Sequence, residues 1–204
     1  VMRDAKVVFT TRAADTNPRE LARMMVGRDV LMELPRTNRT PGRTVLSVDG
    51  LSCDNEIGLP AVRNVSLEVR EGEIVGIAGV SGNGQSELAL AMTGLLPVTS
   101  GTISLNGEEI SRLRPGEVNR RPIGHVPEDR HKMGIVLPLA LTENVLLQRY
   151  NRPPFARHGL LKFGTIAEHT RDLIRRFRVK ASGEFDLIQN LSGGNQQKLV
   201  VARE

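Results

Sequence analysis

The sequence predicts an α/β fold in which an antiparallel β part precedes a helical part. Residues 44–52, 62–72 and 102–110 alternate apolar and polar side chains, which is typical of half-buried antiparallel strands. The continuous apolar run GEIVGIAG, residues 72–79, enters a glycine-rich turn and is typical of a strand buried in a parallel sheet. From about Pro138 onward the pattern is helical.

Residues 1–30 are expected to form a small separate unit. The segment KVVFT, residues 6–10, is strand-like, and a helix is expected after it. Four residues mark the limits of this helix: Asn17 as N-cap, Pro18 at the first position, Glu20 in a capping box and Gly27 at the end. Residues 31–43 mix Pro, Arg, Thr and Gly without periodicity, and we expect a linker there.

The β part is expected to contain one tight turn and two buried strands. Asn106 and Gly107 lie between two segments that alternate polar and apolar side chains, and this pair predicts a hairpin turn. The buried run at 72–79 continues through the glycine-rich turn into a predicted helix at 86–94. Residues 123–129, IGHVPED, predict a second short buried strand.

Three helices are expected in the rest of the chain. Thr142 is expected to cap a helix over 143–149. A capping box of Thr165 and Glu168 is expected to start a helix over 166–179. The pair Gly193 and Gly194 is expected to open the last helix.

The composition is that of a globular chain with an ordinary core. Of 204 residues, 39% are hydrophobic, and 28 Lys and Arg against 23 Asp and Glu give a net charge of +5. This excess suits an anionic ligand or a membrane surface. Aromatic residues make up only 3%, which disfavours stacking platforms for single-stranded nucleic acid. The sequence shows no signal peptide and no run of 18 apolar residues, so no bilayer-spanning segment is expected.

Two basic segments have two interpretations. In the simpler interpretation both segments are solvated surface. In the other they dock on a membrane partner or on anionic lipid. The segments are RYNRPPFARH at 149–158 and RRFRVK at 175–180. The histidines show no metal-ligand spacing, so no metal site built on them is expected. Cys53 is the single cysteine, which excludes an internal disulfide, and no basic partner is in view to activate its thiol.

A glycine-rich loop lies between the run at 72–79 and the helix at 86–94. Its sequence, GVSGNGQSEL, matches the phosphate-binding pattern G-x-x-x-x-G-K-[ST] except at the lysine. A loop between a buried strand and a helix directs backbone N–H groups and the helix dipole at one point, which favours a polyphosphate. The expected nucleotide-binding residues are Gly79, Ser81, Asn83, Gly84, Gln85, Ser86 and Glu87, with Ser86 also the Mg²⁺ ligand. A plain strand-to-helix turn without a ligand is the alternative.

Gln85 replaces the lysine of this pattern. A lysine there reaches the β- and γ-phosphates and neutralises charge during phosphoryl transfer. A neutral hydrogen bond is worth about 1 kcal/mol, whereas a charge-assisted one is worth about 1.5–3 kcal/mol. We therefore expect weaker ATP binding and poorer hydrolysis, but not the loss of the pocket.

A second motif is more specific than the loop. LSGGNQQK, residues 191–198, resembles the signature of ABC-transporter ATPases. The resemblance implies an ABC-type P-loop NTPase domain, here partial, with an antiparallel β subdomain and a helical subdomain that carries the signature. In that family the serine and glycines of the signature contact the γ-phosphate of ATP held by the opposite half of a dimer, a role that the resemblance gives to Ser192, Gly193 and Gly194. Gln196 is a further residue of the signature. A serine N-cap followed by flexible glycines is the alternative.

The segment GNQQK narrows the resemblance to tandem ATPase subunits of sugar and nucleoside importers, in which two nucleotide-binding halves share one chain. HVPEDRHKMG, residues 125–134, is similar to the second halves of this group and places Glu128 at the switch-loop position. GNGQSE is closer to the nucleoside systems. The implied domains are the tail of a first half at 1–30, a linker at 31–43 and the front two-thirds of a second half at 44–204, with its β subdomain and loop core up to about 135 and its helical subdomain from about 136.

The sequence departs from the family in three respects. The family's second nucleotide motif and its switch histidine are expected beyond the signature helix, where the sequence has ended. No aromatic residue lies in residues 53–60, where the family stacks adenine. We therefore interpret the sequence as a fragment that does not hydrolyse ATP alone.

The function that the resemblance implies is that of an importer's ATP-binding subunit, which uses ATP and Mg²⁺ to drive uptake of a sugar or nucleoside. The expected partners are another nucleotide-binding half and transmembrane permease subunits, without nucleic acid, at the cytoplasmic face of the inner membrane. Two alternatives remain. One is a non-catalytic regulatory half that acts as a dimer partner, favoured by Gln85 and Glu128, and the other is a soluble ABC-type ATPase acting on DNA or ribosomes.

Overall fold

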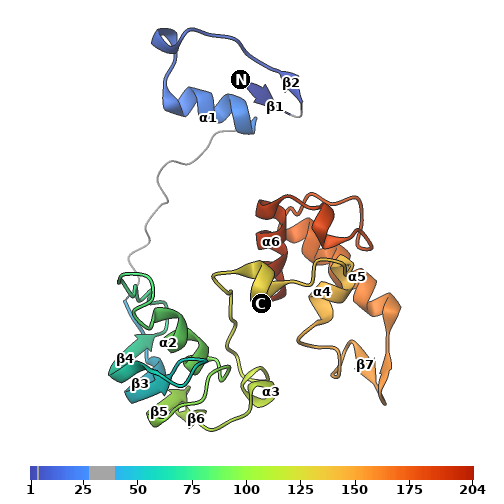
Figure 1. The fold of residues 1–204 in the computed structure, drawn as a ribbon. Helices are drawn as coiled ribbons and strands as arrows, with labels where there is room; N and C mark the ends of the chain where they lie inside the picture. The colour runs from blue at the N-terminus through green and yellow to red at the C-terminus, as the bar shows by residue number, and fades with distance from the viewer. Residues whose placement is uncertain (4, 28–39) are drawn as a thin grey trace. The chain divides into compact units, whose positions relative to one another are not determined.

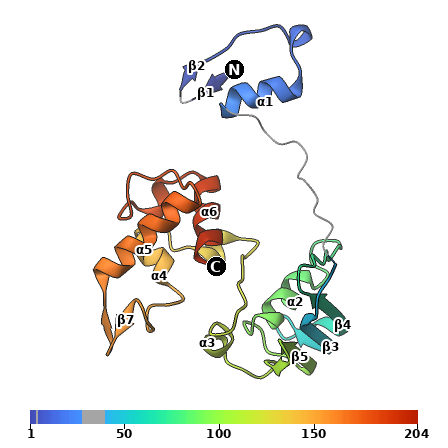
Figure 2. The same cartoon turned by 180° about the vertical axis from the view of Figure 1, so that it is seen from behind.

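The computed structural model describes residues 1–3, 5–27 and 40–204 (Figures 1 and 2). The chain divides into two compact units, Val1–Pro41 and Gly42–Glu204. Most of the predicted linker and the last residues of the predicted N-terminal unit lie outside the described residues. In the described part, no helix has both the length and the hydropathy needed to cross a membrane.

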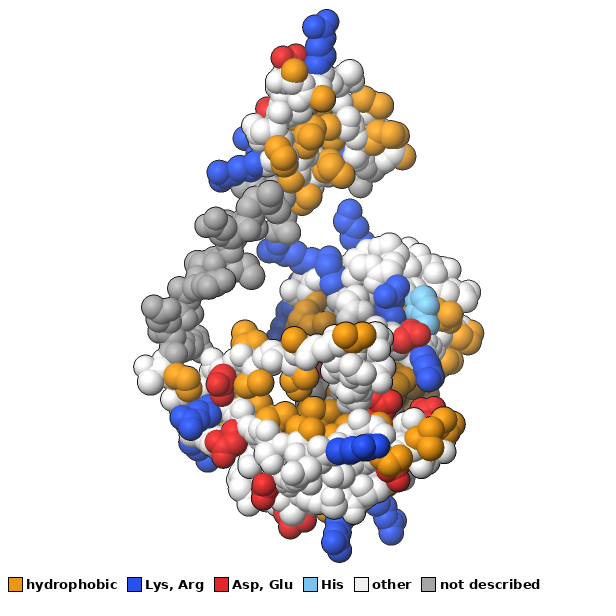
Figure 3. Space-filling model, turned by 60° about the vertical axis from the view of Figure 1, so that its left-hand side comes forward, with side chains coloured by type: hydrophobic (Ala, Val, Ile, Leu, Met, Phe, Trp, Pro, Cys, Tyr) orange, Lys and Arg blue, Asp and Glu red, His pale blue; other side chains and the backbone are white. Residues whose placement is uncertain are grey.

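The first unit contains a short hairpin and one helix. Its elements are β1 (Met2–Arg3), antiparallel to β2 (Lys6–Val7), a 3₁₀ turn η1 (Ala13–Asp15) and α1 (Pro18–Val26). The predicted helix limits are confirmed: Asn17 Oδ1 accepts from the Glu20 N–H at 2.9 Å, and Gly27 closes the helix with a φ of 77°. The predicted capping box is only half formed, because the Glu20 carboxylate accepts from the Thr16 hydroxyl at 3.3 Å and not from the Asn17 N–H. No residue of α1 is buried, and hydrophobic side chains lie on the surface of this unit (Figure 3).

The second unit begins with an antiparallel sheet of order β4-β3-β5-β6. Its strands are β3 (Thr44–Asp54), β4 (Pro60–Arg70), β5 (Ser100–Leu105) and β6 (Glu108–Glu109). The turn predicted between the last two is confirmed, because Asn106 and Gly107 both have positive φ angles, 51° and 82°. Helix α2 (Gln85–Met92) packs on this sheet, and its Leu88 joins Val48 and Ile103 in one buried core.

The prediction of two buried parallel strands, at 72–79 and 123–129, is wrong. Neither segment forms a strand, and both leave apolar side chains in solvent, with Ile74 97% exposed. A parallel strand needs neighbouring strands and helices on both faces. Among the described residues no strand pairs with either segment, so Ile74 and Val126 stay exposed, although Ile123 packs against the core that contains Val48.

The rest of the second unit is mainly helical. Its elements are α3 (Pro115–Val118), a π-helical turn η2 (Arg130–Gly134), α4 (Leu141–Leu146), the hairpin β7 (Ala156–Arg157) and β8 (Leu160–Leu161), α5 (Phe163–Arg176), a 3₁₀ turn η3 (Ile188–Asn190) and α6 (Gly193–Arg203). Helices α4, α5 and α6 share a second core that includes Leu141, Leu173 and Leu199.

Two predicted helix starts in this part are wrong by two or three residues. Helix α4 begins at Leu141, because the Glu143 carboxylate accepts from the Ala140 N–H at 2.8 Å, and Thr142 is buried inside the helix. Helix α5 begins directly after β8, so Thr165 lies in its first turn instead of capping it. The predicted start of α6 at Gly193 is confirmed, with Ser192 as N-cap.

Candidate functional site

The glycine-rich loop is fixed at its C-terminal end by the sheet. Gly84 has a φ of 90° and is buried, and a side chain there would bring its Cβ to 2.5 Å from the Ala61 carbonyl oxygen of β4. Only glycine fits this approach without strain. The requirement for Gly84 therefore comes from packing alone, and its presence is no evidence of a ligand.

Helix α2 begins immediately after this glycine. The N–H groups of Gln85, Ser86 and Glu87 have no acceptor within the helix, and the positive end of its dipole lies there. The Gln85 amide folds back over Gly79 and occupies the space that a side chain on Gly79 would need. The two ends of the loop therefore meet at Gln85, the position where the common pattern has lysine.

Ser86 and Glu128 lie side by side although 42 residues separate them in the sequence. The Ser86 hydroxyl donates to Glu128 Oε2 at 3.2 Å, and both side chains are exposed. A hydroxyl and a carboxylate oxygen form the hard-oxygen donor set that suits Mg²⁺, which binds through few protein oxygens plus phosphates and water. The residues predicted for the loop and for the switch position thus come together at the start of α2.

A cavity of about 750 Å³ opens beside this pair. It lies between α2, the turn after β3 at Asn55–Ile57 and the segment 125–133. Its charged lining side chains are Glu56, Glu87, Glu128, Asp129 and Lys132. Four carboxylates against one lysine disfavour a free polyphosphate, so an anionic ligand here requires an accompanying cation.

The signature residues lie at the N-terminus of α6. The Ser192 hydroxyl oxygen accepts from Asn195 Nδ2 at 2.9 Å, so its proton is available to a ligand. Gly193 and Gly194 open the helix. A Cβ on Gly193 would lie 2.7 Å from Arg130 Nη2, which places this guanidinium against the signature. None of the three predicted residues lines the cavity beside Ser86.

Gln196 has a different environment from the other signature residues. It is only 5% exposed, and its Nε2 donates to the Ile188 carbonyl oxygen at 3.1 Å. Its Oε1 accepts from Arg130 Nε at 3.1 Å and lies 3.0 Å from His131 Nε2. The side chain therefore holds the turn η2 against α6, which supports a positioning role.

The segment 128–131 contacts both parts of the predicted site. Glu128 accepts from Ser86 at the loop, and Arg130 donates to Gln196 on the signature helix. Asp129 caps the turn between them by accepting from the His131 N–H at 2.9 Å. Sequence reasoning found Glu128 in the motif PEDRHK but missed the role of the arginine that follows it.

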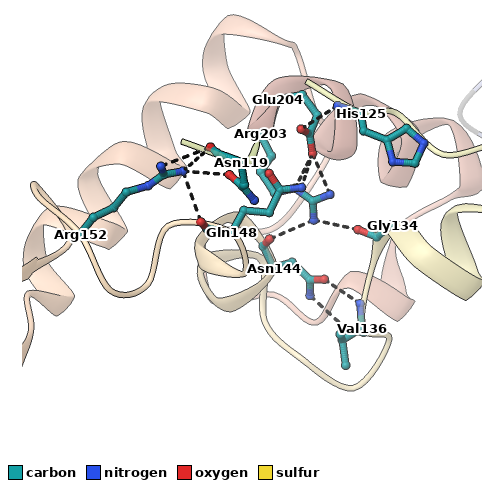
Figure 4. A network of polar contacts seen from close by, with 9 residues as sticks. All are labelled: Asn119, His125, Gly134, Val136, Asn144, Gln148, Arg152, Arg203 and Glu204. Atoms are coloured by element: carbon teal, nitrogen blue, oxygen red, sulfur yellow. Dashed lines mark hydrogen bonds and ion pairs between the residues drawn. The ribbon is translucent and has the colours of Figure 1, made fainter. Parts of the chain in front are cut away.

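A buried polar network, also missed from the sequence, fixes this segment to the helices (Figure 4). The Arg203 guanidinium forms a buried ion pair with Glu204 at 3.0 Å and donates to the Gly134 carbonyl oxygen at 2.8 Å. It also donates to the Asn144 carbonyl oxygen at 3.4 Å. The end of α6 thus anchors both the last residue of η2 and helix α4.

The same network reaches the start of the segment. Glu204 accepts from the His125 N–H at 3.2 Å and from Gln148 Nε2 at 2.8 Å. Nearby, Arg152 Nη2 donates to Asn119 Oδ1 at 3.0 Å (Figure 4). Both ends of the segment 125–134 are therefore held by charge-assisted hydrogen bonds, which are about twice as strong as neutral ones.

Cys53 lies behind the candidate site and is buried. Its Sγ lies 3.9 Å from the Glu87 carbonyl oxygen. Burial raises the pKa of the thiol, and the carboxylates of Glu87 and Asp54 raise it further. The thiol is thus protonated at neutral pH and inert as a nucleophile.

Comparison with known proteins identifies the class. The family model described as ABC transporter matches residues 62–204. The chain belongs to the ABC transporter family, and its fold is that of the family's ATPase domain in partial form.

The chain is also similar to particular import proteins along its whole length. It is 46% identical over 204 residues to the guanosine import ATP-binding protein NupO of Bacillus subtilis, and 43% identical to the nucleoside import ATP-binding protein NupA of Lactococcus lactis. It is 40% identical over 203 residues to the ribose import ATP-binding protein RbsA 1 of Rubrobacter xylanophilus. Each alignment covers 100% of this chain but only 39–40% of the relative.

Solved structures confirm the predicted fold class. The ATP-binding cassette MJ0796, solved as a dimer in a post-hydrolysis state, matches with a TM-score of 0.62 at 24% identity over 78% of this chain and 68% of that one. The cassette MJ1267 matches with a TM-score of 0.60 at 19% identity over 79% and 64% of the two chains. At these identities the likeness concerns the fold alone.

Proposed function

We propose that this chain binds Mg²⁺-ATP as part of an importer's ATP-binding subunit, and that the complete subunit couples ATP binding to uptake of a nucleoside or sugar. The observation that carries the proposal is the meeting of Ser86 and Glu128 at the free N–H groups of α2, beside an open cavity. A nucleoside is the first choice of solute, because the relatives NupO and NupA are named for guanosine and nucleoside import.

The nucleotide's phosphates would meet the loop backbone from Gly79 to Gly84 and the first amides of α2. Ser86 and Glu128 would hold Mg²⁺ with their oxygens, and the ion would offset the carboxylates of the cavity. Ile57, an exposed apolar side chain on the cavity rim, occupies the region where the family stacks an aromatic residue on adenine. It offers the base a small apolar contact in place of a ring.

The proposed organisation extends beyond this chain, which spans about 40% of the length of the relatives NupO and NupA. Residues 1–30 would end a first nucleotide-binding half, 31–43 would link the halves, and 44–204 would belong to the second half. The other half and transmembrane permease subunits would be the partners, at the cytoplasmic face of the membrane. Ser192, Gly193 and Gly194 would act on the nucleotide of the opposite half.

A second function is favoured by the charge of the cavity. Four carboxylates and the uncharged Gln85 beside the loop suit a half that binds nucleotide loosely and serves as a dimer partner without hydrolysing it. The two functions differ in whether the second half turns over ATP in the complete subunit.

The polypeptide 1–204 alone is expected to bind ATP weakly and to show no turnover. Gln85 supplies no charge to the phosphates, and the signature would act on a nucleotide held by another half. A phosphate-release assay with Mg²⁺, beside the complete subunit as positive control, measures turnover, and calorimetry measures binding. Magnesium-dependent turnover by 1–204 would contradict this expectation. Binding that Ser86→Ala and Glu128→Gln leave unchanged would overturn the assigned site.

Gln85→Lys is expected to tighten Mg²⁺-ATP binding by about tenfold, because a charge-assisted hydrogen bond replaces a neutral one at a difference of about 1.4 kcal/mol. The Gln85 amide already folds over Gly79, where the loop would surround the phosphates. Titration calorimetry on both proteins measures the change. Gln85→Met, of similar length but without charge or donor, is the matched control and should not tighten binding. Unchanged or weaker affinity for Gln85→Lys would mean that the loop does not surround phosphate.

A further inference from the structure

The hairpin β7–β8 extends from the helical part (Figures 1 and 2). Its turn, His158 and Gly159, has φ angles of 52° and 79°. Its base is anchored by Phe155, which is buried and lies 5.0 Å from the His169 ring of α5. Phe155 also packs in a small core with Leu146 and Ile166. The hairpin is therefore anchored at its base, whereas Arg157, Leu160 and Leu161 on its strands are exposed.

Four residues of this region form what we name the hairpin surface: Arg157, Leu160, Lys162 and Phe163. Arg157 and Leu160 are directly paired across the strands, so their side chains point to the same face. Lys162 directly follows β8 and is also exposed. Leu160 and Phe163 are both 75% exposed. Two exposed apolar side chains and two exposed cations thus lie together within residues 157–163.

The surroundings of the hairpin surface are positively charged. Residues 144–167 contain no Asp or Glu. The pKa of His169 at the base of the hairpin is lowered, first by burial and then by the charge of Arg149. The Asp172 carboxylate opposes this shift, and Arg176 adds to it. Three carboxylates lie on the neighbouring helices α4 and α5. Glu143 caps α4, and Asp172 pairs with Arg175 and Arg176. Glu168 follows the acid-free residues 144–167 in α5.

We propose that the hairpin surface binds the anionic headgroups of a membrane, with Leu160 and Phe163 entering the interfacial layer. Exposed apolar side chains flanked by basic ones are the pattern of interfacial membrane contact. Each basic residue near an anionic surface contributes about 1 kcal/mol. This inference needs no nucleotide and is independent of the proposed function.

A membrane is a better occupant than the cytoplasmic loops of a membrane protein. Such loops carry an excess of Lys and Arg, so they would repel Arg157 and Lys162. Phosphate headgroups match these cations in charge, while the acyl boundary accepts Leu160 and Phe163. Charge complementarity therefore selects lipid.

The test is flotation of the purified complete subunit, without permease, on vesicles of phosphatidylcholine with or without phosphatidylglycerol. We expect binding only to the anionic vesicles, weakening as salt rises. Arg157→Gln with Lys162→Gln should lower the partition coefficient about thirtyfold, from about 1 kcal/mol for each basic residue. Leu160→Ser with Phe163→Ser should lower it at least as much.

Matched controls remove the same groups elsewhere on the surface. Arg63→Gln with Arg70→Gln removes two exposed charges from β4, and Phe185→Ser removes an exposed aromatic ring. Both should leave vesicle binding unchanged. Equal binding to neutral vesicles, or equal losses in the controls, would overturn the proposal, and so would binding that requires the permease. Titration of the same variants with ATP shows whether they still bind nucleotide, so a loss of vesicle binding can be distinguished from a failure of the proposed function. The salt dependence of wild-type vesicle binding tests the proposal even if a variant misfolds.

Discussion

Gly193→Asp in the complete subunit is expected to abolish ATP turnover. The substitution places a carboxylate at the start of α6, beside Ser192 and against Arg130 Nη2, at 2.7 Å from the new Cβ. That carboxylate would lie beside the Arg130 guanidinium, at the point where the signature meets a phosphate under the proposed function. Two like charges about 4 Å apart repel by about 4 kcal/mol at the effective dielectric of a protein surface, which corresponds to about a thousandfold in rate.

Two companion variants separate charge from volume. Gly193→Asn adds the same bulk without charge and should retain far more activity than Gly193→Asp. Ser192→Ala removes one hydrogen bond of about 1 kcal/mol and should cost about fivefold. Steady-state phosphate release on all three, with thermal melting as a check of folding, gives the comparison.

The assignment of roles also predicts what should not matter. Gln85→Ala in the complete subunit should change turnover little, because under the proposed function this half contributes mainly its signature to hydrolysis. If Gln85→Ala removed most of the activity and Gly193→Asp did not, the roles of loop and signature would have to be exchanged.

Features with local causes could be predicted from the sequence. The limits of α1 follow from Asn17 and Gly27, whose effects act within four residues. The turn at Asn106 and Gly107 follows from their tolerance of positive φ. The start of α6 is expected at the pair Gly193 and Gly194, and the helix begins at Gly193 although the Ser192 side chain makes no capping hydrogen bond.

Features that depend on neighbours distant in the chain could not be predicted. The run at 72–79 has the composition of a buried strand, but a strand also needs partners, and the described chain supplies none for it. Thr142 and Thr165 are residue types that commonly cap helices. Helix α4 nevertheless begins earlier because Glu143 caps it at Ala140, and α5 begins earlier because it follows the end of β8.

The candidate site shows the same division. The loop and the signature are contiguous motifs and are readable in the sequence. Arg130 meets Gln196 across 66 residues, and Arg203 meets Gly134 across 69. The hydrophobic periodicity of a sequence carries no information about such contacts. The connection between the segment 125–134 and helix α6 could therefore be found only in the structure.

Asn144→Asp is expected to be the most destabilising single change near the site. Asn144 is 1% exposed, and its Oδ1 accepts from the Val136 N–H at 2.8 Å. Its Nδ2 donates to the carbonyl oxygens of Val136, Leu139 and Ala140 at 3.1–3.2 Å. A carboxylate would turn these three contacts into repulsions, so the free energy of unfolding should fall by at least about 3 kcal/mol.

The loss should depend on pH in a defined direction. Burial among carbonyl oxygens would raise the pKa of the new carboxyl above its unfolded value of about 3.9. Its protonated form can donate to one carbonyl, so the variant keeps more of its stability below that value and loses it as pH rises through the raised pKa. Urea denaturation at acidic and neutral pH, with wild type measured at each, should show the larger deficit at neutral pH. Asn151→Asp, the same change at an exposed position, should show almost none. An equal deficit at both pH values would mean that the carboxyl escapes to solvent. The attachment of the segment that carries Glu128 and Arg130 would then rest on Arg203, Glu204 and Gln196 without a contribution from Asn144.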